Sequence, residues 1–193
     1  IMYRILYVDD EADLLELGKH FLEKTGQFSV TTYTSAPDAL ASLKSVYYDA
    51  IIADYRMPGM NGIEFLQAIR ESGRSTPFII FSGKGDQDTA ILALNAGADY
   101  YLKKGGETIS LFAELGEVVR LRVLRRQAIL DLSDQEQRYH DIQNANDLIQ
   151  SVTPDGRFLF VNNTWLKTLE YQDSEVQELT IFDIIHEESL EHC

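Results

Sequence analysis

The chain has 193 residues, of which 45% are hydrophobic, enough for a packed medium-sized domain and a smaller piece rather than a disordered protein. Its formal net charge of −14 at pH 7 disfavours direct binding to nucleic acid or to an anionic membrane surface, because the long-range field repels polyanions. A single cysteine, no apolar run of bilayer-spanning length and no signal-peptide pattern favour a cytoplasmic protein without internal disulfides.

The first part of the chain alternates short apolar strands with amphipathic helices. Strands are predicted at 3–8, 28–33, 50–54, 78–82 and 100–103. They are apolar on both faces and rich in Ile, Val, Tyr and Phe, as buried parallel strands are. Helices are predicted between them, near 11–24, 36–46, 61–72 and 86–96. Five such repeats of ~20 residues each predict an α/β fold with a doubly wound parallel sheet.

A long helix is predicted to begin near Glu107 and to continue to about Ile142. Mostly apolar residues recur on it at spacings of three and four: Val118, Leu121, Arg125, Ala128, Leu132, Gln135, Tyr139 and Ile142. This spacing is typical of a coiled-coil seam and favours a parallel homodimer, to which the surface of the first domain would contribute. The alternative is a long helix that packs on its own domain.

The pattern changes again after Asn144. Strand candidates at 148–152 and 158–161 flank a turn that contains Asp155-Gly156, a strong hairpin signal. Asn162-Asn163 is expected to cap a short helix that runs through Leu169. A small α+β segment is therefore expected after the long helix.

Polar side chains follow the predicted strands where each strand ends: Asp9, Asp10, Asp54, Ser82 and Lys104. Because the carboxyl ends of parallel strands lie on one edge of a sheet, these groups are expected to converge. Three carboxylates repel one another unless a cation lies among them, and Mg²⁺ prefers such hard oxygen ligands. Asp54, alone at the end of the central strand, is the candidate nucleophile for an aspartyl phosphate, and Lys104 and Ser82 would bind phosphoryl oxygens.

Each of these residues has a simpler interpretation when it is taken alone. Asp9-Asp10 would equally suit a cap for the helix that follows, and Asp54 would suit a loop carboxylate. Their joint placement, at successive strand ends, favours the phosphate-binding pocket. Arg56 and Lys84, two residues after Asp54 and Ser82, are predicted to project over its mouth and to slow hydrolysis of the phosphorylated state. The alternative is that both side chains point into solvent.

Residues 2–125 resemble the receiver domain of two-component response regulators. The resemblance rests on Val8-Asp9-Asp10, residues 54–62, Phe81-Ser82-Gly83 and residues 97–104. It implies a flavodoxin-like five-stranded parallel sheet of order 2-1-3-4-5. It also implies that a histidine kinase or a phosphotransfer protein passes a phosphoryl group from its phosphohistidine to Asp54.

The same resemblance assigns roles within the pocket. It implies that Mg²⁺ is held by Asp10, Asp54 and the backbone carbonyl of Arg56, with Asp9 acting through water. It implies that the phosphoryl group is bound by Lys104, Ser82 and Gly83.

A switch pair also follows from the resemblance. Ser82 would move its hydroxyl to the phosphoryl group, and the ring of Tyr101 would follow inward. One departure stands out, because Gly105-Gly106 follows Lys104 where the family usually has a proline. A more mobile loop is therefore expected after Lys104.

Residues 143–193 resemble the first half of a PAS sensor domain. The resemblance rests on residues 144–149, 155–162 and 169–171. A PAS domain contains three further strands, so we expect a truncated PAS-like segment within a longer hybrid sensor or regulator. The expected domains are a receiver at 2–125, a helical, coiled-coil linker at 126–142 and the PAS-like segment at 143–193.

The expected function is a phospho-accepting signalling domain, not an enzyme. It would relay a conformational change through the face formed by its fourth and fifth strands and helices, along the linker helix, to the PAS-like segment. A haloacid-dehalogenase-like phosphatase is disfavoured because Arg56 stands where a second Asp would be needed. A flavodoxin-like cofactor binder is disfavoured because Asp9-Asp10-Glu11 would repel a phosphate. A DNA-binding response regulator is disfavoured by the charge of −14 and the lack of a basic helix-turn-helix.

Overall fold

The computed structural model describes residues 2–83 and 87–184. The chain divides into two compact units, residues 1–128 and 129–193, and the boundary lies inside the long helix α5 (Thr108–Gln143). No helix in the described part of the chain is both long enough and apolar enough to cross a bilayer.

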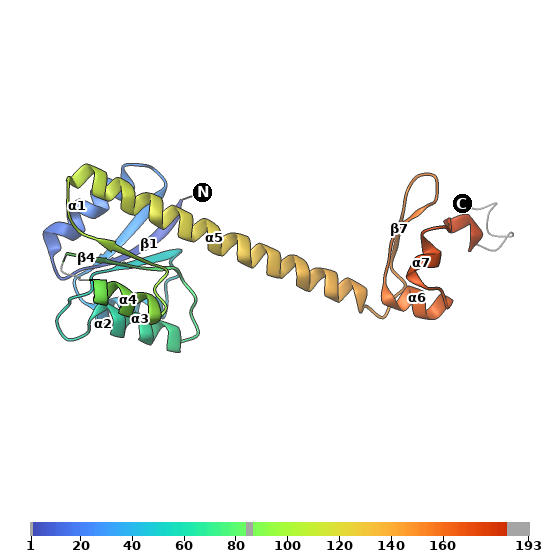
Figure 1. The fold of residues 1–193 in the computed structure, drawn as a ribbon, viewed down its shortest axis with the longest axis horizontal. Coiled ribbons are helices and arrows are strands. Elements are labelled where there is room, and N and C mark those ends of the chain that lie inside the picture. Colours follow the sequence, from blue (N-terminus) through green and yellow to red (C-terminus); the bar gives the residue numbers. More distant parts are fainter. Residues whose placement is uncertain (1, 84–86, 185–193) are drawn as a thin grey trace. The chain divides into compact units, whose positions relative to one another are not determined.

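The first unit contains a five-stranded parallel sheet of order β2-β1-β3-β4-β5 (Figure 1). Its strands are β1 (Tyr3–Val8), β2 (Phe28–Tyr33), β3 (Ala50–Ala53), β4 (Phe78–Ser82) and β5 (Tyr100–Lys103). The α/β fold class, the flavodoxin-like strand order and the parallel pairing are therefore confirmed. All four residues of β3 are buried, as expected for a central strand covered on both faces.

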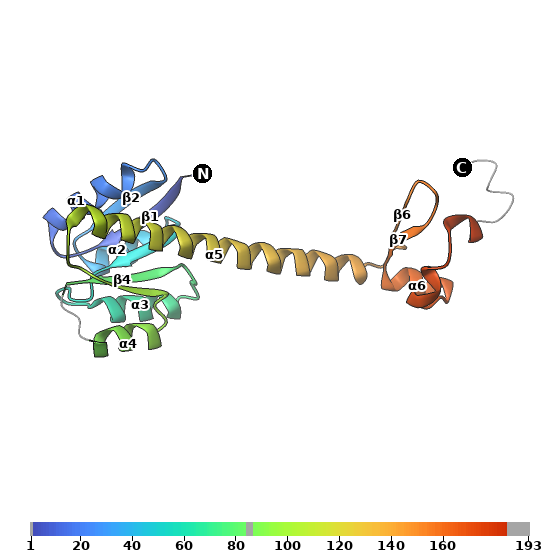
Figure 2. The same cartoon turned by 45° about the horizontal axis from the view of Figure 1, so that its top comes forward.

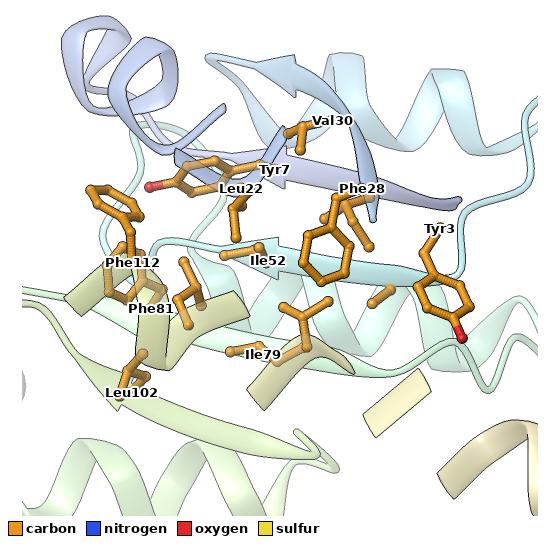
Figure 3. Close-up of a cluster of buried hydrophobic side chains, with 14 of the residues drawn as sticks. Tyr3, Tyr7, Leu22, Phe28, Val30, Ile52, Ile79, Phe81, Leu102 and Phe112 are labelled. Atoms are coloured by element: carbon orange, nitrogen blue, oxygen red, sulfur yellow. The ribbon is translucent and has the colours of Figure 1, made fainter. Parts of the chain in front are cut away.

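Helices cover both faces of this sheet: α1 (Ala12–Glu23), α2 (Ala36–Leu43), α3 (Gly62–Glu71), α4 (Gln87–Asn95) and the first half of α5. Helices α1 and α5 lie on one face, and α2, α3 and α4 lie on the other (Figure 1 and Figure 2). One core cluster joins Leu22 of α1 and Phe112 of α5 to Tyr7 and Phe81 of the sheet (Figure 3). A second cluster packs α2, α3 and α4 against the opposite face.

Local capping explains where two of these helices begin. Ser35 precedes α2 and accepts a hydrogen bond from the main-chain N–H of Asp38 (3.3 Å). Asn61 precedes α3 and forms a capping box with Glu64, in which each side chain accepts from the other residue's main-chain N–H (3.0 and 2.8 Å). These caps satisfy N–H groups that have no partner within the helix, and so fix the first turn.

The second unit contains the end of α5 and a small α+β segment. Its elements are the antiparallel strands β6 (Gln150–Val152) and β7 (Phe158–Val161), the helices α6 (Asn163–Leu169) and α7 (Asp173–Val176), and a 3₁₀ turn at Ile181–Asp183. The predicted hairpin and the Asn162-capped helix are present, with a core of Val161, Trp165 and Val176. The described residues end at Ile184, so the last part of the predicted 143–193 segment lies outside them. Its PAS-like identity stays a prediction.

Candidate functional site

The carboxyl edge of the sheet carries a pocket of about 370 Å³. Its lining consists of Asp10, Glu11, Asp54, Arg56, Ser82, Gly83 and Lys104. Asp9 is fully buried and contacts the pocket through Lys104. The structure thus brings together the residues that the sequence placed at the strand ends, and adds Glu11, which sequence reasoning used only as an obstacle to phosphate.

Asp54 is held from both sides at the end of β3. Its main-chain N–H donates to the carbonyl of Val8 (2.9 Å), and its Oδ2 accepts from the main-chain N–H of Arg56 (2.5 Å). Behind it, α3 begins so close that a Cβ on Gly62 would collide with the Asp54 carbonyl oxygen. The glycine at 62 is needed because the helix approaches the Asp54 backbone, a requirement that the sequence did not reveal.

Lys104 bridges two carboxylates. Its Nζ lies 2.7 Å from Oδ2 of Asp9 and 2.7 Å from Oδ1 of Asp54. Burial lowers the pKa of the Lys104 ammonium, but the hydrogen bonds and charges of Asp54 and Asp9 outweigh burial and raise the pKa above its usual value. Lys104 therefore stays a cation in the pocket, and its stem passes beside Gly83, whose Cβ would lie 3.6 Å from Lys104 Cδ.

Asp9 lies beneath this ion pair. Burial raises the pKa of its carboxyl group, and the hydrogen bond from Lys104 offsets only part of that rise. Tyr7 Oη donates a long hydrogen bond to Asp9 Oδ2 (3.5 Å), and burial, followed by the charge of Asp9, raises the pKa of Tyr7 well above its usual range. Tyr7 therefore remains a neutral donor, a support for Asp9 that sequence reasoning did not identify.

Ser82 and Tyr101 lie on neighbouring strands, β4 and β5. Ser82 is 1% exposed, and within the described residues its Oγ has no hydrogen-bond partner. An unpaired buried hydroxyl is unfavourable, so this one suits a group that enters the pocket. Tyr101 is half-buried and packs against the cluster on the α2–α4 face, opposite Ile80 in the strand register.

The structure describes one of the two cations predicted to slow hydrolysis. Arg56 is exposed and lines the pocket, and its effect on hydrolysis stays a prediction. Lys84 lies outside the described residues. Beyond Lys104, the peptide bonds to Gly105 and Gly106 are trans, and Gly106 has a φ of 88°, which glycine adopts without strain.

The donor set of the pocket fits a divalent cation. Three carboxylates, Asp9, Asp10 and Asp54, face one ammonium, Lys104, so negative charge remains in excess. In residues 2–83 and 87–184, no three His, Cys, Asp or Glu side chains form a metal-binding group by themselves. Mg²⁺ accepts such an open arrangement, because it binds one or two carboxylates and keeps several waters.

Comparisons with known proteins agree with this geometry. The family model for the response regulator receiver domain matches residues 5–115. Response regulator ArlR of Staphylococcus aureus is 36% identical over 134 residues, which are 69% of this chain and 58% of that protein. The chain thus spans little more than half the length of this curated relative.

Two solved structures extend the comparison to three dimensions. A response regulator receiver domain protein from Clostridium thermocellum is 30% identical with a TM-score of 0.60, over 66% of this chain and 99% of that one. The receiver domain of Francisella response regulator 1452 is 28% identical with a TM-score of 0.59, over 64% of this chain and 98% of that one.

Proposed function

The chain belongs to the response regulator receiver domain family of two-component systems, and we propose that Asp54 is its phosphorylation site. Receiver domains interact with histidine kinases or phosphotransfer proteins and generally bind Mg²⁺ at the phosphorylation site. The observation that carries the proposal is the contact of Lys104 Nζ with Oδ1 of Asp54, beside the Ser82 hydroxyl, which has no hydrogen-bond partner in the part of the chain that the structure describes.

The transfer replaces one bond to phosphorus with another. The Asp54 carboxylate forms an O–P bond while the N–P bond of the donor phosphohistidine breaks. Lys104 keeps Asp9 as a partner and turns its ammonium to a phosphoryl oxygen, and Ser82 donates its hydroxyl to another. Asp10, Asp54 and the main-chain carbonyl of Arg56, with Asp9 acting through water, would hold Mg²⁺, which would neutralise charge on the phosphoryl group.

Intact mass measured after incubation with acetyl phosphate and Mg²⁺ tests this assignment. The wild type is expected to gain one phosphoryl group and Asp54→Asn none. Asp49→Asn is the matched control, because Asp49 precedes the same strand at its opposite end and accepts from the main-chain N–H of Arg4. Phosphorylation of Asp54→Asn at the wild-type rate would overturn the assignment.

We propose that the domain is a signalling component rather than a phosphatase for separate substrates. Arg56 occupies the position where a phosphatase of this chemistry needs an acid. Incubation with p-nitrophenyl phosphate distinguishes the two, because multiple turnovers would favour the phosphatase. Arg56 itself lines the mouth where a hydrolytic water must approach, so Arg56→Ala is expected to shorten the life of the phosphorylated protein. Equal decay in both proteins would remove that role.

The signal is proposed to pass from the switch pair to α5. Arg122 of α5 stacks over the ring of Tyr100, 5.1 Å from its centroid, and Tyr100 is the neighbour of Tyr101. One turn later, Arg126 donates to Tyr47 Oη (2.5 Å). Movement of β5 at Tyr101 would therefore act on the same helix that continues into the second unit.

The end of α5 is tied to the hairpin of the second unit through Asn162, which is fully buried. Its amide nitrogen donates to main-chain carbonyls at and after the end of α5, those of Ile142, Ala145 and Asp147 (3.2, 3.4 and 2.9 Å). Its amide oxygen accepts from the main-chain N–H groups of Ile149 (3.1 Å) and Trp165 (3.0 Å). These five contacts support a relay from α5 to the second unit, which we propose to be the first part of a PAS sensor module.

We propose that α5 also carries a parallel dimer contact. Its seam residues Leu121, Leu132, Tyr139 and Ile142 are 50%, 57%, 60% and 43% exposed. Sedimentation at concentrations of about tens of micromolar tests the contact. Leu121→Glu with Leu132→Glu is expected to give monomers. Leu124→Glu with Leu130→Glu, exposed positions on the same helix but off the seam, is the matched control. A monomeric wild type would rule out this contact.

A further inference from the structure

A glycine inside α5 has no packing explanation. Glycine within a helix is destabilising relative to alanine. A Cβ on Gly116 would lie 3.5 Å from Leu22 Cδ2 and 3.6 Å from Phe28 Cε2, which are ordinary van der Waals distances. Gly62, by contrast, has no room for a Cβ. The helix would thus tolerate alanine at 116, and the glycine leaves open space instead.

That space is the floor of a groove, which we call the α1–α5 groove. It has a volume of about 340 Å³ and is lined by the end of α1, the start of β2 and the first turns of α5. Phe21 and Phe112 stack in its wall with their ring planes nearly parallel (4°) and their centroids 5.5 Å apart. Phe28 and Leu22 belong to the same buried cluster (Figure 3). Ile109, 61% exposed, lies at the rim.

The charges on the groove differ in sign from those of the whole chain. Its lining carries two cations, Lys24 and Arg120, against one carboxylate, Glu117, in a chain whose net charge is −14. Arg120 pairs with Glu117 through two hydrogen bonds, from Nε (2.8 Å) and Nη2 (2.7 Å), and both side chains are partly exposed. The three charges of the lining therefore sum to +1, which favours an anionic partner.

We propose that the α1–α5 groove binds a small amphiphilic anion, a compound with one compact apolar group and one carboxylate or sulfonate. The apolar group lies on Phe21, Phe28 and Phe112 above Gly116. The anion faces Lys24 and Arg120. The volume lies at the lower end of the range for small-molecule sites, which fits a compound of one or two rings rather than a helix of a protein partner. Such a ligand would tie α1 to the helix that leaves the receiver.

The dye 1-anilinonaphthalene-8-sulfonate has this chemistry and is the probe for a titration of the full chain. Its fluorescence is expected to rise to saturation at one site per chain. Gly116→Leu, which places a side chain in the groove, is expected to weaken binding about tenfold or more. Lys24→Gln with Arg120→Gln is expected to weaken it less, because the apolar contact remains.

Ala68→Leu is the matched control, because Ala68 lines a separate apolar groove between α2 and α3. It is expected to leave the affinity unchanged. Near-ultraviolet circular dichroism establishes that each variant is folded, and Gly116→Ala, whose Cβ makes only ordinary contacts, is a second and milder variant. Amide shifts at Thr25, Phe28 and Gly116 in ¹H–¹⁵N spectra are expected to follow the titration.

Two results would overturn the proposal. One is unchanged affinity in both folded Gly116 variants. The other is loss of binding in Ala68→Leu with no loss in Gly116→Leu, which would place the dye in the α2–α3 groove. Neither result depends on phosphorylation, so this test is independent of the role assigned to Asp54.

Discussion

Lys104 Nζ lies 2.7 Å from Oδ1 of Asp54, so the cation expected to bind the phosphoryl group already neutralises the carboxylate that would carry it. The same ammonium holds the fully buried Asp9. Before phosphorylation, therefore, Lys104 neutralises part of the carboxylate charge that a divalent cation would neutralise in this pocket.

Removing that ammonium is expected to make the protein depend on Mg²⁺. Lys104→Met leaves two buried carboxylates unpaired, and breaking such a pair costs about 3 kcal/mol. The variant should unfold at a lower temperature than the wild type. Added Mg²⁺ should raise the unfolding temperature of the variant by more than it raises that of the wild type. Lys103→Met, the exposed neighbour, is the control and should behave as wild type. Equal Mg²⁺ stabilisation in all three proteins would contradict this role for Lys104.

Ser82→Ala is expected to separate folding from phosphoryl binding. Because the Ser82 hydroxyl is buried and has no hydrogen-bond partner among residues 2–83 and 87–184, its loss should change the free energy of unfolding by less than about 1 kcal/mol. The rise in melting temperature on addition of Mg²⁺ and beryllofluoride, a phosphoryl analogue, should be smaller than in the wild type. Ser82→Thr keeps the hydroxyl and should restore the rise. A full rise in Ser82→Ala would show that the hydroxyl does not bind the phosphoryl group.

Two glycine substitutions are expected to have opposite effects. Gly62→Ala forces α3 away from the Asp54 carbonyl, at a cost of about 1–3 kcal/mol, and should slow phosphorylation by acetyl phosphate. Gly116→Ala removes a helix-interior glycine without a clash and should stabilise the first unit by up to about 1 kcal/mol. Urea unfolding followed by far-ultraviolet circular dichroism compares them. Equal stability of the two variants would mean that the backbone at Gly62 moves at no cost.

The sequence predicted the sheet and the position of the pocket because hydrophobic periodicity and the polar residues that end each strand are local signals. The strands at 3–8, 28–33 and 78–82 agree with the structure, and their terminal polar residues had to meet once the strands were parallel. The interaction partners of these terminal residues, by contrast, are not determined by the local sequence. That Lys104 contacts both Asp9 and Asp54 depends on the relative heights of three strand ends, separated by up to 95 residues. The distances from Lys104 to the two carboxylates therefore cannot be predicted from the sequence alone.

The sequence likewise does not show how much space surrounds a glycine in the folded protein. Gly62 and Gly116 are both glycines at or within helices, and the sequence alone does not show that their surroundings differ. One faces the Asp54 backbone and the other faces a groove. Asn162 likewise reads as a helix cap, a role it does fill toward Trp165, but its contacts with Ile142 and Ala145 depend on where α5 ends.

Asn162→Ala is expected to destabilise the second unit by about 2–3 kcal/mol, because it leaves buried N–H and carbonyl groups without partners. Trp165 is the only tryptophan and is 2% exposed, so its fluorescence during urea unfolding follows this unit. Asn163→Ala is the matched control, since only the main-chain N–H of Asn163 takes part in the junction, with Gln143 Oε1. Similar midpoints for the two variants would argue against Asn162 as the tie between α5 and the hairpin.

Acid is expected to weaken the second unit through two exposed turn carboxylates. A hydrogen bond with the Thr153 side chain, aided by Arg157, lowers the pKa of Asp155 below its usual value of 3.8. The main-chain N–H of Thr180 (2.7 Å) and its hydroxyl (2.8 Å) donate to Asp183 Oδ2 and lower the pKa of that carboxyl group as well.

The sign of the effect follows from proton binding. A carboxylate whose pKa is lower in the folded state binds protons more readily when unfolded, so its stabilising contribution is present above pH 3.8 and is lost as the pH falls through the folded pKa. Trp165 fluorescence should therefore report a unit that unfolds more easily below about pH 4. Asp155→Asn with Asp183→Asn should show a weaker acid dependence, whereas Asp173→Asn, exposed on α7, should follow the wild type. Parallel acid curves for the double variant and the wild type would assign the acid sensitivity to other groups.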